Sequence, residues 1–371
     1  MEALQSLIAG FTNFTWKHGI MLAIGILLIY LAIKKEYEPV LLLPMGVGCI
    51  LANIPLSSSV IEGGWLNVLY NAGIANELFP VLIFIGIGAM IDFSPLFKRP
   101  VMLLFGAAAQ MGIFVAMLLA NATGMFTLRE SVAIGIIGAA DGPTSIYVAG
   151  LFAQKYLGPI TVAAYSYMAL VPIIQPPVIK LLTSRQERLI RMDADYDLTV
   201  KKSIKISFPI IVTIVAGFIA PSSTPLIGSL MFGNLLRESL VVNSLSETAQ
   251  KELANIVTLL MGVTIGSTMV AERFVALETI LILFIGLLAF VFDTVGGVLL
   301  AKIINIFLKE KLNPMIGACG ISAFPMSARV IQKMAVKEDP TNFILMPAIS
   351  ANVSGQIGSI IAGSVLIAML L

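Results

Sequence analysis

The sequence predicts an all-α protein that crosses a membrane many times. Of its 371 residues, 58% are hydrophobic and only 12% are charged, whereas soluble domains carry about 25% charged residues. The mean hydropathy is +0.97, and apolar runs close to the ~20 residues that a helix needs to cross a bilayer recur along most of the chain. Because these runs leave little sequence for a soluble domain, we expect one integral membrane domain.

Spanning segments are expected wherever an apolar run is long enough to cross the bilayer. About nine such segments are predicted, at residues 19–33, 39–55, 79–94, 101–120, 159–182, 206–220, 254–271, 276–303 and 343–371. The net charge of +2 is small and the basic residues lie in short loops, which indicates topology signals and no nucleic-acid partner. The chain holds one histidine, so a transition-metal site and histidine-based catalysis are not expected.

Two groups of basic residues predict which loops face the cytoplasm. The larger group lies in the loop 183–205, and Lys98 with Arg99 marks a second loop. With both loops inside, the segment 101–120 must leave the cytoplasm and the next spanning segment must return to it. The stretch 131–154 between them then makes no net crossing, which predicts a re-entrant hairpin or a broken helix.

A lone carboxylate marks this stretch. The sequence "GIIGAADGPTSIYVAG" (135–150) contains one charged residue, Asp141, followed by Gly142 and Pro143. Because glycine and proline are poorly suited to continue a helix, we expect the hairpin to break at these two residues. A buried carboxylate costs about 2.5–3.5 kcal/mol on membrane-insertion scales, so a functional role for Asp141 is favoured over helix capping or a structural ion pair.

A second stretch resembles the first and predicts two inverted repeats. The block "GIIGAADGPTS" (135–145) aligns without a gap with "GACGISAFPMS" (317–327), matching two glycines, a proline and a serine. If the repeats are inverted, the lysines around the second block fall on the cytoplasmic side, as the positive-inside rule requires. Two opposed hairpins predict a transporter of elevator or rocking type, in which one block moves against a scaffold.

The predicted organisation divides the chain into four regions. They are an N-terminal membrane scaffold or oligomerisation region (1–75), a first repeat (76–182) with its hairpin (131–154), a cytoplasmic basic loop (183–205) and a second repeat region (206–371) with its hairpin (313–332). The N-terminal region is assigned to the scaffold because it lacks broken polar motifs.

Two helix breaks that face each other near the midplane would bring carbonyl, hydroxyl and carboxylate oxygens together. Irregular backbone is tolerated at that depth only inside protein or beside a watery cavity, and broken-helix transporters hold Na⁺ in this way. Asp141 would supply the charge, while Asn313, Ser322 and Ser327 would add neutral oxygens. The pattern therefore predicts a sodium site between the two hairpins.

Other polar residues in the apolar runs receive structural interpretations. Four acids are assigned to interface or capping roles near segment ends: Asp92, Glu272, Glu278 and Asp293. The small residues of "ANVSGQIGSIIAG" (351–363) predict tight helix packing, and a cavity lined by Asn352, Ser354 and Gln356 is the alternative.

Spacing alone leaves three further residues ambiguous. Arg329 lies four residues after Pro325, where a snorkelling arginine at the cytoplasmic end of a helix and an anion-binding arginine are both possible. Tyr165 and Tyr167 lie in "AAYSYMALVPIIQPP", and an interfacial or core position is the ordinary interpretation of such tyrosines.

Four blocks of the chain closely resemble the β-subunit family of biotin-dependent, sodium-pumping decarboxylases. They are "GAADGPT", "AYSYMALVPIIQPP", "PLIGSLMFGNLLRE" and "NPMIGACGISAFPMSARV". The resemblance covers nearly the whole chain from the first apolar segment onward. These bacterial and archaeal complexes act on oxaloacetate, methylmalonyl-CoA, glutaconyl-CoA or malonate.

The resemblance implies a membrane subunit that receives carboxybiotin from a partner biotin-carrier protein and releases CO₂ from it. This step would drive Na⁺ export and consume a proton taken up from outside. Further implied partners are a carboxyltransferase subunit and small membrane subunits of gamma or delta type, around a homo-oligomeric core in the cytoplasmic, or inner, membrane of a bacterium or archaeon.

The resemblance also implies site residues, carried over by motif. The catalytic set is Tyr167, Arg329 and Asp141; the carboxybiotin-binding set is Arg329, Ser322 and Asn313; the sodium-binding set is Asp141, Asn313, Gly317 and Ser322. Arg329 would bind the carboxylate of carboxybiotin, and Tyr167 would deliver the proton.

Two other functions stay open from the residues. The same broken helices could move Na⁺ together with an organic anion, such as citrate or a bile acid, as a secondary transporter without chemistry. The chain could also be a passive anchor for soluble subunits. The parent acid is not predicted, because substrate choice would reside in the carboxyltransferase subunit.

Overall fold

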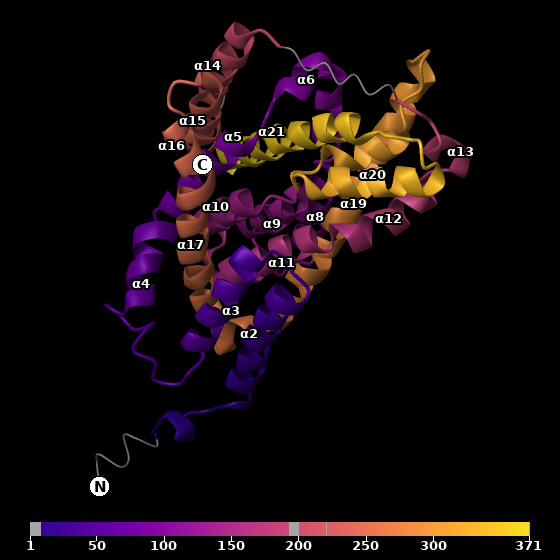
Figure 1. Ribbon diagram of the computed structural model, residues 1–371. Helices are drawn as coiled ribbons and strands as arrows, with labels where there is room; N and C mark the ends of the chain where they lie inside the picture. Colours follow the sequence, from indigo (N-terminus) through magenta and orange to yellow (C-terminus); the bar gives the residue numbers. More distant parts are fainter. Residues whose placement is uncertain (1–8, 193–199, 220, 371) are drawn as a thin grey trace.

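The computed structural model describes residues 9–192, 200–219 and 221–370. Within these ranges every regular element is a helix, and the helices pack into one body (Figure 1). The α-helices are α2 (Trp16–Lys34), α3 (Pro39–Ala52), α4 (Trp65–Leu69), α5 (Leu78–Met90), α6 (Ser94–Lys98), α7 (Leu103–Ala108), α8 (Met111–Ala122), α9 (Leu128–Gly135), α10 (Gly142–Phe152), α11 (Leu157–Ala169), α12 (Val171–Leu182), α13 (Arg185–Arg188), α14 (Lys202–Ile219), α15 (Thr224–Ser239), α16 (Asn243–Thr248), α17 (Ala254–Thr268), α18 (Ala271–Phe274), α19 (Leu277–Phe307), α20 (Met326–Glu338) and α21 (Leu345–Leu370). The predicted all-α class is confirmed.

Short 3₁₀ and π-helical turns connect or extend these helices. They are η1 (Tyr70–Ile74), η2 (Pro100–Met102), η3 (Ile136–Ala139), η4 (Gln154–Tyr156), η5 (Pro221–Ser223), η6 (Ala249–Leu253) and η7 (Pro314–Gly320). Two of them, η3 and η7, belong to the predicted hairpins.

Four of the described helices are long and apolar enough to cross a membrane alone. They are α2, α19, α21 and the continuous stretch Pro100–Ala122, and two bent helix pairs raise the number to six. The pairs are Trp65–Ile74 with Leu78–Met90, bent by 62°, and Gln154–Ala169 with Val171–Leu182, bent by 68°. The chain is therefore a polytopic membrane protein, whereas the larger number of spans stays a prediction.

Fewer membrane-spanning helices are found among the described residues than the nine predicted because several of the helices are short. At about 1.5 Å per residue, α3 with its 14 residues is about 21 Å long, less than the ~30 Å of a bilayer core. Helices α15 and α17 are of similar length, with 16 and 15 residues. The apolar runs 39–55 and 254–271 are thus longer than α3 and α17, the helices that they form.

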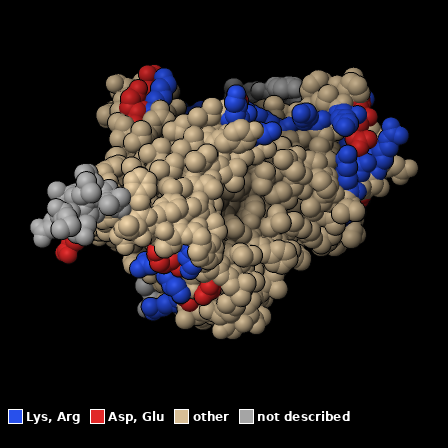
Figure 2. All heavy atoms as spheres, turned by 90° about the horizontal axis from the view of Figure 1, so that it is seen from below, with Lys and Arg blue, Asp and Glu red and all other residues tan. Residues whose placement is uncertain are grey.

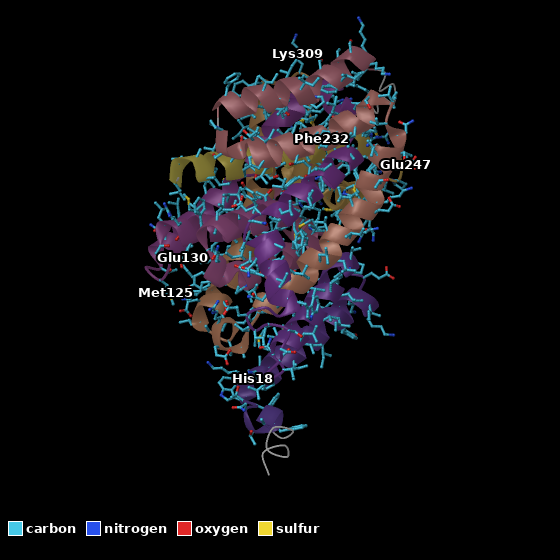
Figure 3. All side chains as sticks on the ribbon, turned by 90° about the vertical axis from the view of Figure 1, so that its left-hand side faces the viewer. His18, Met125, Glu130, Phe232, Glu247 and Lys309 are labelled. Atoms are coloured by element: carbon cyan, nitrogen blue, oxygen red, sulfur yellow. The ribbon has the colours of Figure 1, made fainter. Side chains whose placement is uncertain are left out.

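The surface agrees with a membrane environment. Seen from below, the broad face of the molecule is almost free of charged side chains, which gather at its edges (Figure 2). Large apolar side chains are exposed on α14, among them Phe218, which is 85% exposed, as well as Ile211 and Ile214. In Figure 3, Lys309 and His18 lie at opposite ends of the molecule.

Two helix crossings are held close by pairs of glycines. Helix α3 packs against α17 through Gly48 and Gly266, and α5 packs against α15 through Gly88 and Gly233. A Cβ atom on any of these four glycines would collide with a backbone carbonyl of the opposite helix. Small residues allow this close approach, as is usual in membrane helix pairs.

The first hairpin is a broken helix in the centre of the molecule (Figure 1). Helix α9 begins with a capping box, continues as η3, and stops at Ala140, which has a left-handed φ of 52°. Asp141 is extended and is the N-cap of α10. Every residue from 131 to 150 is buried.

The predicted position of this break was wrong by two residues. Gly142 and Pro143 do not end a helix; they are the first two residues of α10. Proline suits that position because the first turn of a helix leaves its backbone N–H groups without intrahelical partners. The break therefore falls at Ala140 and Asp141, which turns the carboxylate into a helix cap.

The second hairpin contains a break of the same kind. Asn313 caps η7, the chain is irregular from Ile321 to Pro325, and α20 follows. The backbone N–H of Ser322 donates a hydrogen bond of 3.3 Å to the carbonyl of Ala139 at the end of η3. The two breaks thus touch each other.

The basic loop contacts the C-terminal end of α20. The Arg188 guanidinium lies 2.8 Å from the Glu338 carboxylate, and Arg191 lies 2.7 Å from that of Asp339. Hydrogen bonds from Thr341 and from Arg191 lower the pKa of Asp339 to about 2. Residues 193–199 of the predicted loop lie outside the described residues.

Asp293 does not lie near the end of a spanning segment, contrary to the prediction. It is in the middle of the 31-residue helix α19 and is fully buried. Its Oδ1 atom accepts a hydrogen bond of 2.7 Å from the backbone N–H of Gly112 at the start of α8. The acid therefore does have a capping contact, but to another helix.

Candidate functional site

Asp141 is buried between the two breaks and α21. Its Oδ2 atom accepts hydrogen bonds from the hydroxyl groups of Ser359, at 2.9 Å, and Ser322, at 3.2 Å. Its Oδ1 atom accepts a bond of 3.3 Å from the backbone N–H of Thr144. Three segments that are far apart in the sequence therefore converge on one carboxylate.

The N-terminus of α10 provides the electrostatic environment of this carboxylate. Asp141 is the N-cap residue, and the exposed N–H groups of a helix start carry a partial positive charge. This field favours a carboxylate over a neutral side chain at the position. The local sequence thus supplies a preorganised place for a negative charge.

Helix α21 supports the second break with amide side chains. Asn352 donates to the carbonyls of Cys319, at 3.2 Å, and Ile321, at 2.7 Å. Gln356 donates to the carbonyl of Ser322. A broken helix frees such carbonyls, and in a membrane they need partners within the protein. The break therefore depends on α21 for its hydrogen bonds.

A small cavity opens beside Asp141. Its volume is about 140 Å³, and Ala140, Ser322, Phe324 and Gln356 are among the residues that line it. Carboxylate, hydroxyl and amide oxygens are the ligands that hard cations take. Among the described residues no group of three or more His, Cys, Asp or Glu could hold a metal ion, so the donor set fits a monovalent cation better than a transition metal.

The two tyrosines of α11 point to different places. The Tyr165 ring lies against Gly142, where any Cβ would collide with it. The Tyr167 hydroxyl donates to the carbonyl of Leu283 on α19. The structure therefore places Tyr165 beside Asp141, and it does not bring the predicted Tyr167 to that carboxylate.

Asn313 and Gly317 are also apart from Asp141. The Asn313 amide donates to the carbonyls of Arg188 and Ile190, both at 2.9 Å, while its oxygen caps η7. Gly317 packs against α19, where a Cβ would collide with the carbonyl of Gly297. Both residues hold η7 in place.

Two further predicted residues have other surroundings. Ser327 donates to Gln175, at 2.9 Å, and to the carbonyl of Ala318, at 3.1 Å. Arg329 is exposed on α20. Of the predicted site residues, the structure brings Asp141 and Ser322 together, while Arg329 lies on the surface of the second hairpin.

The sequence interpretation missed Ser359 and assigned its helix to packing. One signal could have found it: Asn352, Gln356 and Ser359 follow one another at helical spacing and therefore share a face of α21. A polar stripe in an apolar helix indicates that this face meets protein or water. The structure shows that the stripe meets both hairpins.

The sequence is similar to those of known proteins over nearly its whole length. Residues 17–370 match the family model described as "Na+-transporting oxaloacetate decarboxylase beta subunit". Methylmalonyl-CoA decarboxylase subunit beta of Veillonella parvula is 50% identical over 370 residues, which cover 99% of this chain and 98% of the relative. Glutaconyl-CoA decarboxylase subunit beta of Acidaminococcus fermentans is also 50% identical, over 99% of this chain and 97% of the relative.

A more distant relative agrees with these. Oxaloacetate decarboxylase beta chain of Klebsiella pneumoniae is 42% identical over 99% of this chain and 99% of the relative. The interpretation as the membrane subunit of a sodium pump is thereby favoured over that as a secondary transporter. With a match over nearly its whole length, this chain belongs to the family of Na⁺-transporting decarboxylase beta subunits.

Proposed function

We propose that this subunit decarboxylates carboxybiotin on its cytoplasmic side and uses that step to export Na⁺ bound at Asp141. The observation that carries the proposal is the meeting of Asp141 with the hydroxyl groups of Ser322 and Ser359 at two helix breaks. The carboxylate is the only charge in a buried stretch of 20 residues, 131–150. An acid is rarely placed at such a depth without a function.

Sodium would bind to the Asp141 carboxylate together with neutral oxygens of the two serines and the cavity. Both serine hydroxyls now donate to Oδ2, and a rotation of each hydroxyl would turn an oxygen lone pair toward a cation. Export of one Na⁺ against 100 mV costs about 2.3 kcal/mol. The roles of Asn313 and Gly317 as sodium ligands stay predictions.

The cavity beside Asp141 is suited to an ion and not to a cofactor. Sites for drug-sized ligands have volumes of about 300–1,000 Å³, whereas this cavity measures about 140 Å³. Carboxybiotin, which brings the carboxyl group that leaves as CO₂, would therefore meet the protein elsewhere. The exposed guanidinium of Arg329 suits its carboxylate, because arginine binds carboxylates through two parallel hydrogen bonds.

Tyr167 stays the predicted proton donor for the leaving biotin ring. Its hydroxyl now donates to the Leu283 carbonyl, so proton delivery requires that α11 and α19 move apart or that the hydroxyl rotates.

Alternating access would come from inverted repeats. If the two-fold relation also includes α3 of the N-terminal region, α3 would correspond to α15 and α5 to α17. The α3–α17 crossing would then correspond to the α5–α15 crossing. This likeness supports the predicted inversion and an elevator or rocking movement, in which the paired breaks move against the glycine-held helices. The full number of spans and the scaffold role of residues 1–75 belong to the same proposal.

The partners follow from the family. A biotin-carrier protein would present carboxybiotin, a carboxyltransferase would charge the biotin, and small membrane subunits would complete a homo-oligomeric complex. The relatives' names place methylmalonyl-CoA, glutaconyl-CoA and oxaloacetate among the acids used by this family. We place the complex in the cytoplasmic membrane.

The replacement Asp141→Asn tests the proposal in the reconstituted complete complex. Asparagine is as good an N-cap as aspartate, so the complex should assemble, while export of radioactive sodium and sodium-stimulated loss of free carboxybiotin fall together. The matched control is Glu247→Gln, which also removes one acidic charge, at an exposed position (Figure 3).

Each outcome separates the candidate functions. A sodium-stimulated decarboxylation unchanged in Asp141→Asn would contradict the proposed site and favour a passive anchor. Uptake of a labelled organic anion by the wild-type chain without biotin would instead indicate a secondary transporter.

A further inference from the structure

The middle of α19 contains a second buried carboxyl group, Asp293, whose surroundings differ from those of Asp141. Oδ1 accepts the hydrogen bond from Gly112, whereas Oδ2 has no hydrogen-bond partner among the described residues. Asp141 and Asp293 are the only two aspartates that are buried in that part of the chain. Their different environments point to different ligands.

The Asp293 carboxyl group lies against packed backbone at the start of α8. A Cβ atom on Gly112 would lie 2.1 Å from the Ala289 carbonyl oxygen and 2.3 Å from Asp293 Oδ1. The carbonyl of Ala289, one helical turn before Asp293, and Oδ1 therefore both lie against Gly112. The Ala289 carbonyl is the acceptor that a protonated carboxyl at this position would use, since polar side chains in helices often bond the carbonyl four residues back. An ionised Oδ2 would have no hydrogen-bond donor among the described residues to stabilise its charge.

Titratable groups on the elements packed against α19 do not balance a charge at Asp293. They are Tyr165 and Tyr167 on α11, Lys180 on α12, Arg129 and Glu130 on α9, and Cys319 on η7. Arg129 bonds the Leu370 carbonyl, Glu130 caps α9 at Thr127, and Tyr167 bonds Leu283. Lys180 is exposed near the end of α12. The single described polar contact of Asp293 is therefore the Gly112 N–H.

We propose that Asp293 is a proton-binding carboxyl of this protein, which holds a proton at Oδ2 and does not bind sodium. A proton needs one acceptor and one carboxylate oxygen, whereas sodium needs several oxygen ligands at once. Two serine hydroxyls donate to Asp141, whereas no hydroxyl of the described residues donates to Asp293. Asp141 thus binds the sodium ion of the pump, and Asp293 binds the proton.

The position of Asp293 links its proton to the sodium site. Gly112 and Ile113, whose backbone starts α8, lie directly against Gly138, where a Cβ would come within 2.7 Å of the Ile113 nitrogen. Gly138 lies in η3, three residues before Asp141. Loss of the proton would change the contact with Gly112 and hence the packing of the first break. This link rests on the proposed function, whereas the proton site does not.

Infrared spectroscopy of the purified full-length chain tests the proton site directly. A protonated carboxylic acid has a C=O stretching band well separated from that of a carboxylate. We expect this band in the wild type and in Asp141→Asn, with or without added sodium chloride, and its loss in Asp293→Asn. Asparagine retains an acceptor for Gly112 and a donor in place of the acid O–H, so the fold should persist.

Two results would overturn the proton site. One is a wild-type spectrum without the band, and the other is a band that disappears on addition of sodium. Because the wild type is measured without biotin or partners, neither result depends on the decarboxylase function. Labelling of aspartate with carbon-13 in the Asp141→Asn variant would shift the band and assign it to an aspartate other than Asp141, even if Asp293→Asn did not fold.

The use of this proton by the pump has its own measurement. In the reconstituted complete complex, Asp293→Asn should slow sodium-stimulated decarboxylation at least tenfold and leave binding of radioactive sodium unchanged. Full activity of Asp293→Asn would overturn the link between Asp293 and the pump, and loss of sodium binding would overturn the division of the two cations.

Discussion

Ser359 in α21 donates a hydrogen bond of 2.9 Å to Asp141 at the start of α10, which joins two residues 218 positions apart in the chain. The bond connects the C-terminal helix to the first broken helix. Ser322, from the second break, reaches the same oxygen. One carboxylate oxygen is therefore the point at which both hairpins and α21 meet.

Ser359→Ala should weaken sodium binding while leaving the fold intact. A hydrogen bond to a charged group contributes about 1.5–3 kcal/mol, so the sodium dissociation constant should rise by about tenfold to a hundredfold. Isothermal titration of the purified chain with sodium chloride, in a potassium background, measures the change.

The matched control for this change is Ser364→Ala. Ser364 is a buried serine of the same helix whose hydroxyl has no partner among the described residues. If both variants bind sodium with the same affinity, Ser359 is not part of the sodium site.

Gly142→Ala should destabilise the protein because its Cβ would collide with the ring of Tyr165. Overpacking of a buried site costs about 1–3 kcal/mol, and the thermal unfolding midpoint in detergent should fall accordingly. Adding Tyr165→Ala to Gly142→Ala should recover part of the loss caused by the glycine change, since the two residues contact each other.

Gly150→Ala is the control on the same helix. Its Cβ would meet only the Ile74 carbonyl, at 3.8 Å, an ordinary contact. This replacement should leave the midpoint unchanged or raise it, because alanine is a better helix former than glycine. Equal losses in both variants would mean that the Tyr165 ring does not occupy the place beside Asp141.

Asp339 should stabilise the contact with Arg191 of the basic loop only at a pH at which its carboxyl group is ionised. Its pKa is lowered to about 2 by Thr341 and Arg191, from about 3.9 in an unfolded chain. A lowered pKa gives stability that is present above about pH 4 and is lost as the pH falls through about 2. The thermal midpoints of the wild type and Asp339→Asn should therefore differ at pH 6 and converge toward pH 2. A constant difference would contradict the assignment.

Much of the site could be predicted because its signals are local. A single carboxylate in an apolar stretch, followed by glycine and proline, indicates both a break and a buried charge at Asp141. The repeated motif similarly led to Ser322. Ser359 was missed because its role depends on how α21 packs, and hydrogen bonds between distant helices leave little trace in the sequence.

The two errors at Pro143 and Asp293 have a common physical reason. Proline disrupts a helix interior but fits the first turn, so the same dipeptide can end one helix or begin the next. Asp293 caps the start of α8 from another helix, and local sequence describes only caps within one helix. In both cases the sequence indicates that a helix end lies nearby. Which helix ends or begins there depends on how the helices pack in the folded protein.

The reactivity of the two cysteines toward a thiol reagent should indicate which part of the protein moves during transport. Cys319 lies in η7 and Cys49 in α3, and both are free and buried. If the paired breaks move against the helices held by glycine crossings, Cys319 should become accessible to a small thiol reagent when sodium is absent. Cys49, in the crossing with α17, should stay protected with and without sodium.

Mass spectrometry of the native chain can compare both thiols in one sample, because the sequence contains only these two. Sodium should slow the modification of Cys319 and leave that of Cys49 unchanged, since an ion bound at Asp141 fixes Ser322 and with it the end of η7. In Asp141→Asn the effect of sodium on Cys319 should vanish. Faster modification of Cys49 than of Cys319 would reverse the assignment of moving part and scaffold.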